Sequence, residues 1–272
     1  MKITFIGGGN MASSLIGGLI ADGFNIGDIS VVDIDPEKRQ YLSSQYGVQA
    51  FAELSPALEQ VDVAAFCVKP QNFQEVVQAA AADIRRRKPL ILSIAAGIRT
   101  SDIATWLDDS TAIVRAMSNT PALLRCGASG LYANAQTNQA QRDQAESILR
   151  ATGIVEWVED ESLMDVVTAL SGSGPAYFFR IMESMTATAS QMGLPPDVAH
   201  LLTIQTALGA ARMALESGDD LTTLRQRVTS PGGTTEQGLK VMENNNIDQL
   251  ITDILEAARK RSIELADQLG RV

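Results

Sequence analysis

Residues 3–19, ITFIGGGNMASSLIGGL, decide the fold predicted for this chain of 272 residues. The apolar run Ile3–Ile6 is typical of a buried strand, and a helical pattern begins at about Asn10. Between them, Gly7, Gly9 and Ala12 match the Gly-x-Gly-x-x-Gly/Ala pattern of a dinucleotide-binding turn. Gly7 allows the tight turn, and Gly9 lets the backbone approach a pyrophosphate at the helix N-terminus. The stretch therefore predicts a strand, turn and helix that bind a dinucleotide.

The rest of residues 1–160 alternates short apolar runs with helical patterns. The runs ISVVD, VDVAAFCV and PLILSI are nearly continuous in β-branched and aliphatic residues, as buried parallel strands are. TAIVRAM, ASGLYA and IVEWV add further predicted strands, and segments with helical spacing separate most of these runs. This alternation predicts an α/β fold with a Rossmann-type doubly wound parallel sheet.

From about Glu161 to residue 272 the strand patterns stop, and long helical segments bounded by Gly, Pro and Asn follow. The second domain, residues 161–272, is therefore predicted to be all-helical. Its segment PPDVAHLLTIQTALGAARMAL is apolar on nearly every face. Because a helix that is apolar all round must be buried, we expect this segment at the centre of a homodimer.

Composition excludes several classes of function. The net charge of −10 disfavours binding to nucleic acid, because an acidic surface repels phosphate backbones. Apolar runs stay well short of the roughly 18 residues of a membrane span, and the N-terminus lacks a signal-peptide layout, which predicts a cytoplasmic protein with no membrane partner. With one histidine, His200, and two distant cysteines, neither a metal site nor a Ser-His-Asp triad is expected.

The predicted strands end in polar or small residues. Asp33 and Asp35 follow the second strand, where an acid accepts ribose hydroxyls and favours NADH, although either residue is equally expected as a helix N-cap. Lys69 follows VDVAAFCV at the edge of the sheet where ligands bind, and its alternative is an ordinary surface lysine. In SIAAGI, residues 93–98, small side chains would let a flat nicotinamide lie against the backbone, and MSNTP, residues 117–121, repeats this arrangement.

A second glycine turn lies in RVTSPGGTTEQGL, residues 227–239. The amides of Gly232, Gly233, Thr234 and Thr235 precede a predicted helix, which makes this turn a candidate receptor for a carboxylate. Ser230 and the two threonines can add hydroxyl hydrogen bonds. The alternative is an ordinary N-terminal glycine turn without a ligand.

Together these motifs resemble the pyrroline-5-carboxylate reductase family. The resemblance rests on FIGGGNM, CVKP, SIAAG, NTPA, LSGSGPAY, ALGAARM and VTSPGGTTEQGL, in this order over residues 3–268. It implies an N-terminal Rossmann domain and a helical C-terminal domain whose helices interleave with those of a second subunit. It also implies dimers, often assembled into decamers, and reduction of 1-pyrroline-5-carboxylate, a cyclic imine carboxylate, to L-proline with NADPH or NADH.

The resemblance also implies roles for single residues. It assigns the coenzyme to Ile6, Gly7, Gly8, Gly9, Asn10, Met11, Val68, Lys69, Pro70, Ala95, Ala96 and Gly97. It assigns the substrate to Glu161, Ser230, Gly232, Gly233, Thr234 and Thr235. Thr235 takes the position whose hydroxyl contacts the ring nitrogen. Asp33 and Asp35 do not settle the coenzyme, because many members of the family prefer NADPH and carry neutral or basic residues there.

Two alternatives stay open from the residues. One is another NAD(P)H-dependent imine or β-hydroxyacid oxidoreductase with the same two domains. A hydroxyacid dehydrogenase needs a lysine as general acid on a central helix, and Ser173–Leu215 contains none. The other is an NAD(P)H-sensing protein without turnover, which would not need the SPGGTT turn. Reduction of a protonated imine needs position and exclusion of water more than acid–base side chains, which agrees with the single histidine.

Overall fold

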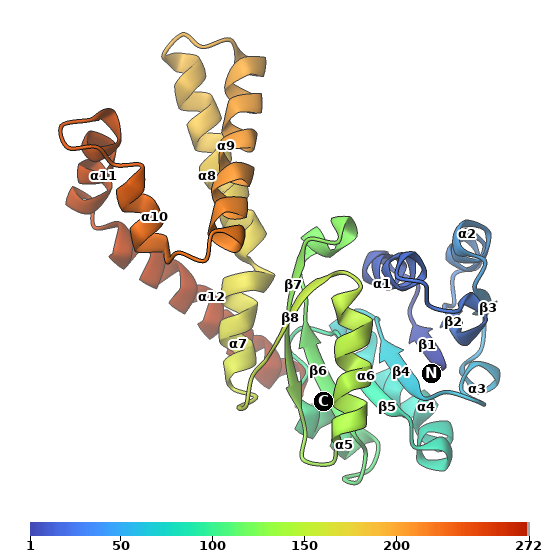
Figure 1. Cartoon of the computed structure of the whole chain (residues 1–272). Coiled ribbons are helices and arrows are strands. Elements are labelled where there is room, and N and C mark those ends of the chain that lie inside the picture. The colour runs from blue at the N-terminus through green and yellow to red at the C-terminus, as the bar shows by residue number, and fades with distance from the viewer. Residues whose placement is uncertain (271–272) are drawn as a thin grey trace. The chain divides into compact units, whose positions relative to one another are not determined.

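The computed structural model describes residues 1–270, which form two compact units (Figure 1). The first unit contains Met1–Ser173 and the C-terminal residues from Ala257, and the second contains Gly174–Glu256. Helix α12 (Ile247–Leu269) therefore begins in the second unit and ends in the first. The last two positions of the predicted helical domain, 271 and 272, lie outside the described residues.

The first unit is built on one eight-stranded sheet with the order β3-β2-β1-β4-β5-β6-β7-β8. Its strands are β1 (Ile3–Ile6), β2 (Ile29–Val32), β3 (Gln49–Phe51), β4 (Val63–Phe66), β5 (Leu90–Ser93), β6 (Ile113–Met117), β7 (Gly127–Ala133) and β8 (Gly153–Trp157). All neighbouring strands are parallel except β6 and β7. The predicted doubly wound parallel sheet is confirmed, apart from the one antiparallel pair.

The structure adds two features that the sequence patterns do not predict. Strand β7 runs antiparallel to β6, because residues 118–126 are too few to hold the crossover helix that a parallel return needs. Strand β3 is a three-residue edge strand, too short to give a recognisable apolar pattern.

Helices cover both faces of the sheet. They are α1 (Asn10–Ala21), α2 (Pro36–Tyr46), α3 (Leu54–Ala57), α4 (Phe73–Arg87), α5 (Thr100–Trp106) and α6 (Gln139–Arg150). Two hydrophobic cores result, and consecutive residues of one strand enter opposite cores: Phe5 packs in one and Ile6 in the other. This two-sided burial explains why the central strands read as continuous apolar runs.

A short helix and an irregular turn lead from the sheet towards the second unit. Helix α7 (Leu163–Val167) continues into a π-helical turn, Thr168–Gly172, which contains the start of the LSGSG motif. A Cβ at Gly172 would lie 2.4 Å from Met117 Cε, so this turn packs against the residues that end β6.

The second unit consists of α8 (Gly174–Gln191), α9 (Pro196–Glu216), α10 (Leu221–Arg227), α11 (Thr234–Asn244) and the first part of α12. The predicted long helices are confirmed, and α8 packs against α9. Within one chain, however, α9 buries only Ala199 and Thr203, while Leu201, Leu208 and Leu215 are more than half exposed. Helix α9 has the length and composition of a membrane span, contrary to the sequence expectation that apolar segments stay well short of one. Core helices of water-soluble proteins meet the same criteria where they are buried, but few residues of α9 are buried in the single chain.

Candidate functional site

Four of the predicted segments meet at one edge of the sheet. The glycine turn follows β1, CVKP follows β4, SIAAG follows β5 and MSNTP follows β6. These four strands are consecutive and parallel, so their carboxyl ends lie side by side. The structure thus brings the segments together at the edge where ligands bind in doubly wound folds.

The glycine turn is packed on one side and open on the other. Gly7 has φ +98°, and a Cβ there would lie 2.9 Å from Cys67 O. A Cβ on Gly8 would lie 2.7 Å from Leu42 Cδ1, whereas one on Gly9 would meet no atom within 4 Å. Gly9 is also the N-cap of α1, whose first turn has neither a capping side chain nor an acidic residue. The open amides of this helix N-terminus fit a pyrophosphate.

The carboxylate of Asp33 accepts a hydrogen bond from the backbone of the glycine turn. Its Oδ2 accepts the Gly8 N–H at 2.7 Å and its Oδ1 accepts the Asp35 N–H at 2.9 Å. Asp33 is only 9% exposed, and Lys38 Nζ lies 3.7 Å from Oδ2. Asp35 is the N-cap of α2 and accepts the Glu37 N–H at 2.9 Å. Both carboxylates are therefore used within the protein.

The turns after β4 and β5 carry the small residues and the lysine that the sequence places there. Ala95 is buried, Ala96 is half-buried and Gly97 has φ +74°. Lys69 is exposed and is the N-cap of a short 3-10 turn, Pro70–Asn72. Val68 is partly buried against the core beneath these turns.

Two serines at the same edge were not predicted as site residues. Ser93 ends β5 and Ser118 follows β6, and both hydroxyl oxygens are buried without a hydrogen-bond partner in the described part of the chain. Buried polar atoms are normally paired, so these hydroxyls are available to a ligand or a bound water. Their positions within SIAAG and MSNTP are the sequence signal that could have found them.

Glu161 lies in a partly buried ionic cluster at the start of α5. Its carboxylate accepts hydrogen bonds from Thr100 N at 2.8 Å and Thr100 Oγ1 at 2.6 Å. Arg115 Nη1 lies 3.2 Å from Glu161 Oε1, and the Arg115 side chain is 4% exposed. Sequence reasoning missed Arg115, although a charged residue within the strand TAIVRAM indicates a buried partner.

The SPGGTT turn lies in the second unit and begins α11. Gly232 has φ +71°, which favours glycine there. Its N–H donates to Glu236 Oε2 at 3.1 Å, and this contact lowers the pKa of Glu236. The Gly233 N–H donates to Ser230 O at 3.0 Å. Two of the four predicted amides are thus used within the turn.

The remaining amides of the SPGGTT turn belong to Thr234 and Thr235, in the first turn of α11. Gly233 is the N-cap of this helix, and no side chain caps it. These amides retain the positive potential of a helix N-terminus, which suits a carboxylate. Sequence reasoning missed Glu236, although an acid three residues after the N-cap is a common partner of such a turn.

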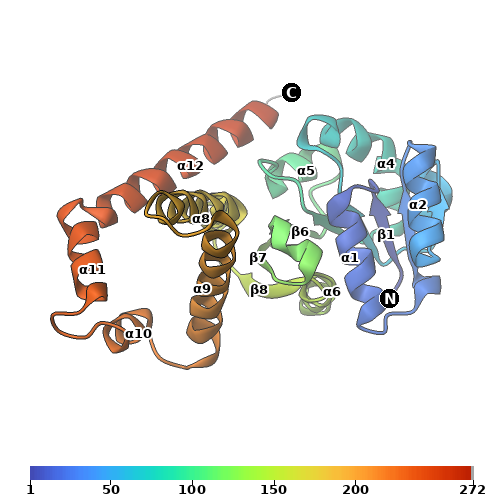
Figure 2. The same cartoon turned by 90° about the horizontal axis from the view of Figure 1, so that it is seen from above.

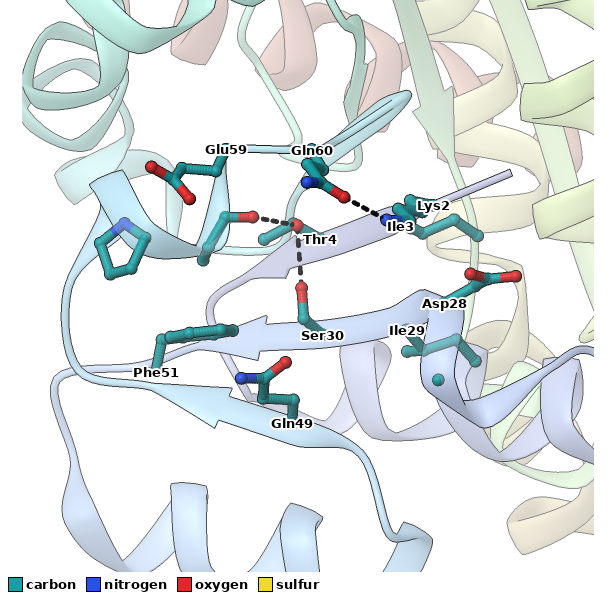
Figure 3. Close-up of a pocket in the computed structure, with 13 residues that line it drawn as sticks. Lys2, Ile3, Thr4, Asp28, Ile29, Ser30, Gln49, Phe51, Glu59 and Gln60 are labelled. Carbon is teal, nitrogen blue, oxygen red and sulfur yellow. Dashed lines mark hydrogen bonds between the residues drawn. The ribbon is translucent and has the colours of Figure 1, made fainter.

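Figure 3 shows a cavity of about 360 Å³ that contains none of the predicted site residues. Its lining includes Thr4 and Ser30, whose hydroxyls lie 2.9 Å apart. Thr4 Oγ1 also donates to Ala57 O at 2.8 Å, so these groups are already paired. Among residues 1–270, no group of three or more His, Cys, Asp or Glu side chains is placed to hold a metal ion.

Comparison with known proteins gives consistent matches over nearly the whole chain. The family model described as pyrroline-5-carboxylate reductase dimerisation matches residues 161–265, and the model described as NADP oxidoreductase, coenzyme F420-dependent, matches residues 2–97. A pyrroline-5-carboxylate reductase of Pseudomonas aeruginosa is 48% identical over 99% of this chain and 98% of its own length.

Solved structures agree with these matches. A pyrroline-5-carboxylate reductase from Coxiella burnetii has a TM-score of 0.95 and 44% identity, covering 97% of this chain and 98% of that one. A Plasmodium falciparum pyrroline carboxylate reductase, solved with NADP bound, has a TM-score of 0.84 and 25% identity, and 98% of each chain is covered.

Proposed function

This chain belongs to the pyrroline-5-carboxylate reductase family, and from that membership we propose which of its residues carry out the reaction. It is an oxidoreductase that reduces 1-pyrroline-5-carboxylate to proline with NADPH or NADH. Two turns carry the assignment of residues. The glycine turn before α1 is open at Gly9, and the SPGGTT turn before α11 has no capping side chain, so its amides can bind a carboxylate.

The coenzyme is proposed to bind along the carboxyl edge of the sheet. Its pyrophosphate faces the open side of Gly9 and the N-terminus of α1, where Asn10 and Met11 begin the helix. Gly7 and Gly8 hold the backbone close enough for this approach, and Ile6 anchors the turn in the core. When bound, the reduced nicotinamide supplies the hydride.

The nicotinamide ring is proposed to lie against the turns after β4 and β5. The backbone at Ala96, which is half-buried between the buried small residues Ala95 and Gly97, is proposed to lie against the flat ring. Val68, Lys69 and Pro70 would line its other edge. These turns fix the face of the ring that can donate hydride, and position of this kind contributes much of the rate in such reactions.

The SPGGTT turn is proposed to hold the substrate. The amides of Thr234 and Thr235 receive the carboxylate, and Ser230 adds a hydroxyl. Thr235 Oγ1 then accepts a hydrogen bond from the protonated ring nitrogen, which orients the C=N bond for hydride transfer. Because the imine arrives protonated, no side chain has to titrate near neutrality.

The chain forms an oligomer, and we propose a homodimer in which α9 is buried against its copy, with dimers able to assemble into a decamer.

We further propose a coenzyme domain of residues 1–160 and a substrate and dimerisation domain of residues 161–272. The start of the dimerisation model at residue 161 supports this division. We also propose a cytoplasmic enzyme that binds neither nucleic acid nor membrane, and the acidic net charge supports the lack of nucleic-acid binding.

The test is an absorbance assay of the purified protein at the reduced-nicotinamide band. With 1-pyrroline-5-carboxylate we expect oxidation of NADPH or NADH, and formation of proline in equal amount. A β-hydroxyacid with NADP⁺ or NAD⁺ should give no reduction. Tight binding of NADPH without any turnover of the imine would instead favour the sensing protein and would overturn the assignment.

A further inference from the structure

The C-terminal half of α12 packs directly on the turn after β5. Helix α12 leaves the second unit at Glu256 and joins the first from Ala257 onward, and Figure 2 shows its end beside α5. A Cβ at Gly97 would lie 3.3 Å from Leu269 Cδ1 and 3.6 Å from Ala266 N. The turn that contains Ala95 and Ala96 therefore touches the backbone of this helix.

An ion pair fastens the end of the same turn to the helix. Arg99 Nη2 donates to Asp267 Oδ1 at 2.7 Å, and this hydrogen bond raises the pKa of Arg99. The Arg99 backbone N–H donates to Asp102 Oδ2 at 3.1 Å. A Cβ at Gly270 would lie 2.6 Å from Asp102 Oδ1, so Gly270, directly after α12, packs against this residue. Arg99 is thus in contact with α12, and Asp102 with the residue that follows it.

A buried contact fixes where α12 lies on the first unit. Ser262 Oγ donates to Asp165 Oδ1 at 2.6 Å, and the two residues are 5% and 7% exposed. One turn later, Ala266 is 1% exposed. This docking does not depend on the Arg99–Asp267 pair, whose side chains are 34% and 42% exposed. Removal of the Arg99–Asp267 pair should therefore loosen the turn after β5, while α12 stays packed on the first unit.

We infer that Asp267, through Arg99, is a positioning residue for the nicotinamide ring. This rests on the proposed function, in which the ring lies against Ala95, Ala96 and Gly97. Strand β5 holds one end of the turn and Glu161 holds Thr100, immediately after its other end. The Arg99–Asp267 pair fixes the turn between them. A displacement of about 1 Å at a reacting centre can slow a reaction about 10²-fold, whereas an exposed ion pair contributes little to folding stability.

The experiment compares Asp267→Ala with Glu264→Ala. Glu264 also lies on α12, and its carboxylate lies 3.0 Å from Arg261 Nη1. The side chains of Glu264 and Arg261 are 45% and 55% exposed, so Glu264→Ala controls for the loss of an ordinary ion pair. For Asp267→Ala we expect kcat to fall about tenfold, with the KM for the imine unchanged. Binding of NADP⁺ should weaken about threefold, while binding of 2′,5′-ADP, which lacks the nicotinamide, should stay unchanged. Glu264→Ala should match the wild type in all four measurements.

Charge reversal supplies the second arm. The double variant Arg99→Asp with Asp267→Arg restores the pair in the opposite sense and should recover most of kcat. Asp267→Asn, which keeps the shape of the side chain but not its charge, replaces the double variant if that variant does not fold. On a logarithmic scale, its loss of kcat should be at least half of the loss in Asp267→Ala. Wild-type kcat in Asp267→Ala, or equal weakening of NADP⁺ and 2′,5′-ADP, would overturn the inference.

These outcomes are separable from those for the proposed function. The comparison of NADP⁺ with 2′,5′-ADP is an equilibrium measurement that needs no turnover. A wild-type protein that does not reduce the imine would therefore overturn the proposed reaction, and the two binding constants would still test whether Asp267 acts on the nicotinamide end of the coenzyme.

Discussion

At the scale of single residues, the hydroxyl of Thr235 carries the most specific prediction. Gly233, and not a threonine, is the N-cap of α11, so loss of the Thr235 hydroxyl removes no helix cap. We expect Thr235→Ala to lower kcat/KM about 10²-fold, as loss of a positioned hydrogen-bonding group does, with little change in Tm. Thr235→Ser keeps the hydroxyl and should retain much of the rate. Coenzyme affinity should stay unchanged in both variants.

Steady-state kinetics and thermal unfolding of the same two variants decide this point. A Thr235→Ala protein that is destabilised but fully active would mean that SPGGTT is a structural turn and that the substrate binds elsewhere. Thr222→Ala, an exposed threonine of α10, is a suitable control for loss of a hydroxyl in the same unit.

Asp33 shows that a sequence motif predicts a residue's type but not its hydrogen-bond partners. An acid at the end of the second strand indicates contact with ribose hydroxyls, which stays a prediction, and the structure adds that its Oδ2 accepts the Gly8 N–H. The sequence predicts which residue type stands there and cannot predict which donor takes its lone pairs. The same holds for Glu161 and Gly232, whose partners Arg115 and Glu236 are set by tertiary packing and by a local turn.

This contact leads to a prediction about coenzyme preference. Asp33→Ala leaves the buried Gly8 N–H unpaired, at a cost of roughly 1–3 kcal/mol in the geometry of the glycine turn. Affinities for NADH and NADPH should therefore fall together, by about tenfold, with their ratio unchanged. Asp35→Ala, which removes only the cap of α2, should cost about 1 kcal/mol of stability and leave both affinities intact. Fluorescence titration with each coenzyme measures the ratio of the two affinities. A selective gain in affinity for NADPH in Asp33→Ala would show that Asp33 contacts the ribose hydroxyls.

At the scale of elements, apolar periodicity is enough to predict most of the first unit. Strands β1 and β4 are buried on both faces, which gives the continuous apolar runs that mark them. The reversed direction of β7 follows from a short connection, and β3 forms only because its few residues pair with β2. The return of α12 to the first unit is not predictable from its pattern, because amphipathic spacing does not say which partner a helix packs against.

Glu161 belongs to this scale, because it joins the loop after β8 to the start of α5. Glu161→Ala would leave Arg115 buried without its partner, and breaking a buried pair in this way costs about 3–5 kcal/mol. We expect Tm to fall on the order of 10 °C. Glu159→Ala, two residues earlier and exposed, should leave Tm unchanged. If Glu161→Ala instead raises the KM for the imine at an unchanged Tm, its carboxylate contacts the substrate as the family resemblance implies.

At the scale of the whole molecule, the exposed apolar surface of the helical unit requires a partner. Leu201, Leu208 and Leu215 on α9 and Phe178 and Phe179 on α8 are each more than half exposed in the single chain. Large apolar side chains exposed in such number on two neighbouring helices indicate an interface. The sequence already indicates this, because α9 is apolar on more faces than one chain of this size can cover.

A substitution within that surface should therefore separate the subunits. Leu208, which is 51% exposed in one chain, becomes buried in the proposed homodimer, so Leu208→Glu places a charge inside the interface. We expect sedimentation of this variant at micromolar concentration to show monomer or unfolded chain, and the wild type to show a dimer or a multiple of it. Leu124→Glu is the control: Leu124 is 80% exposed but lies outside the segment that matches the dimerisation model, residues 161–265. A wild type that is monomeric at this concentration, or a Leu208→Glu variant that sediments like the wild type, would show that α9 does not form the interface, and would leave its apolar faces without the partner that their exposure requires.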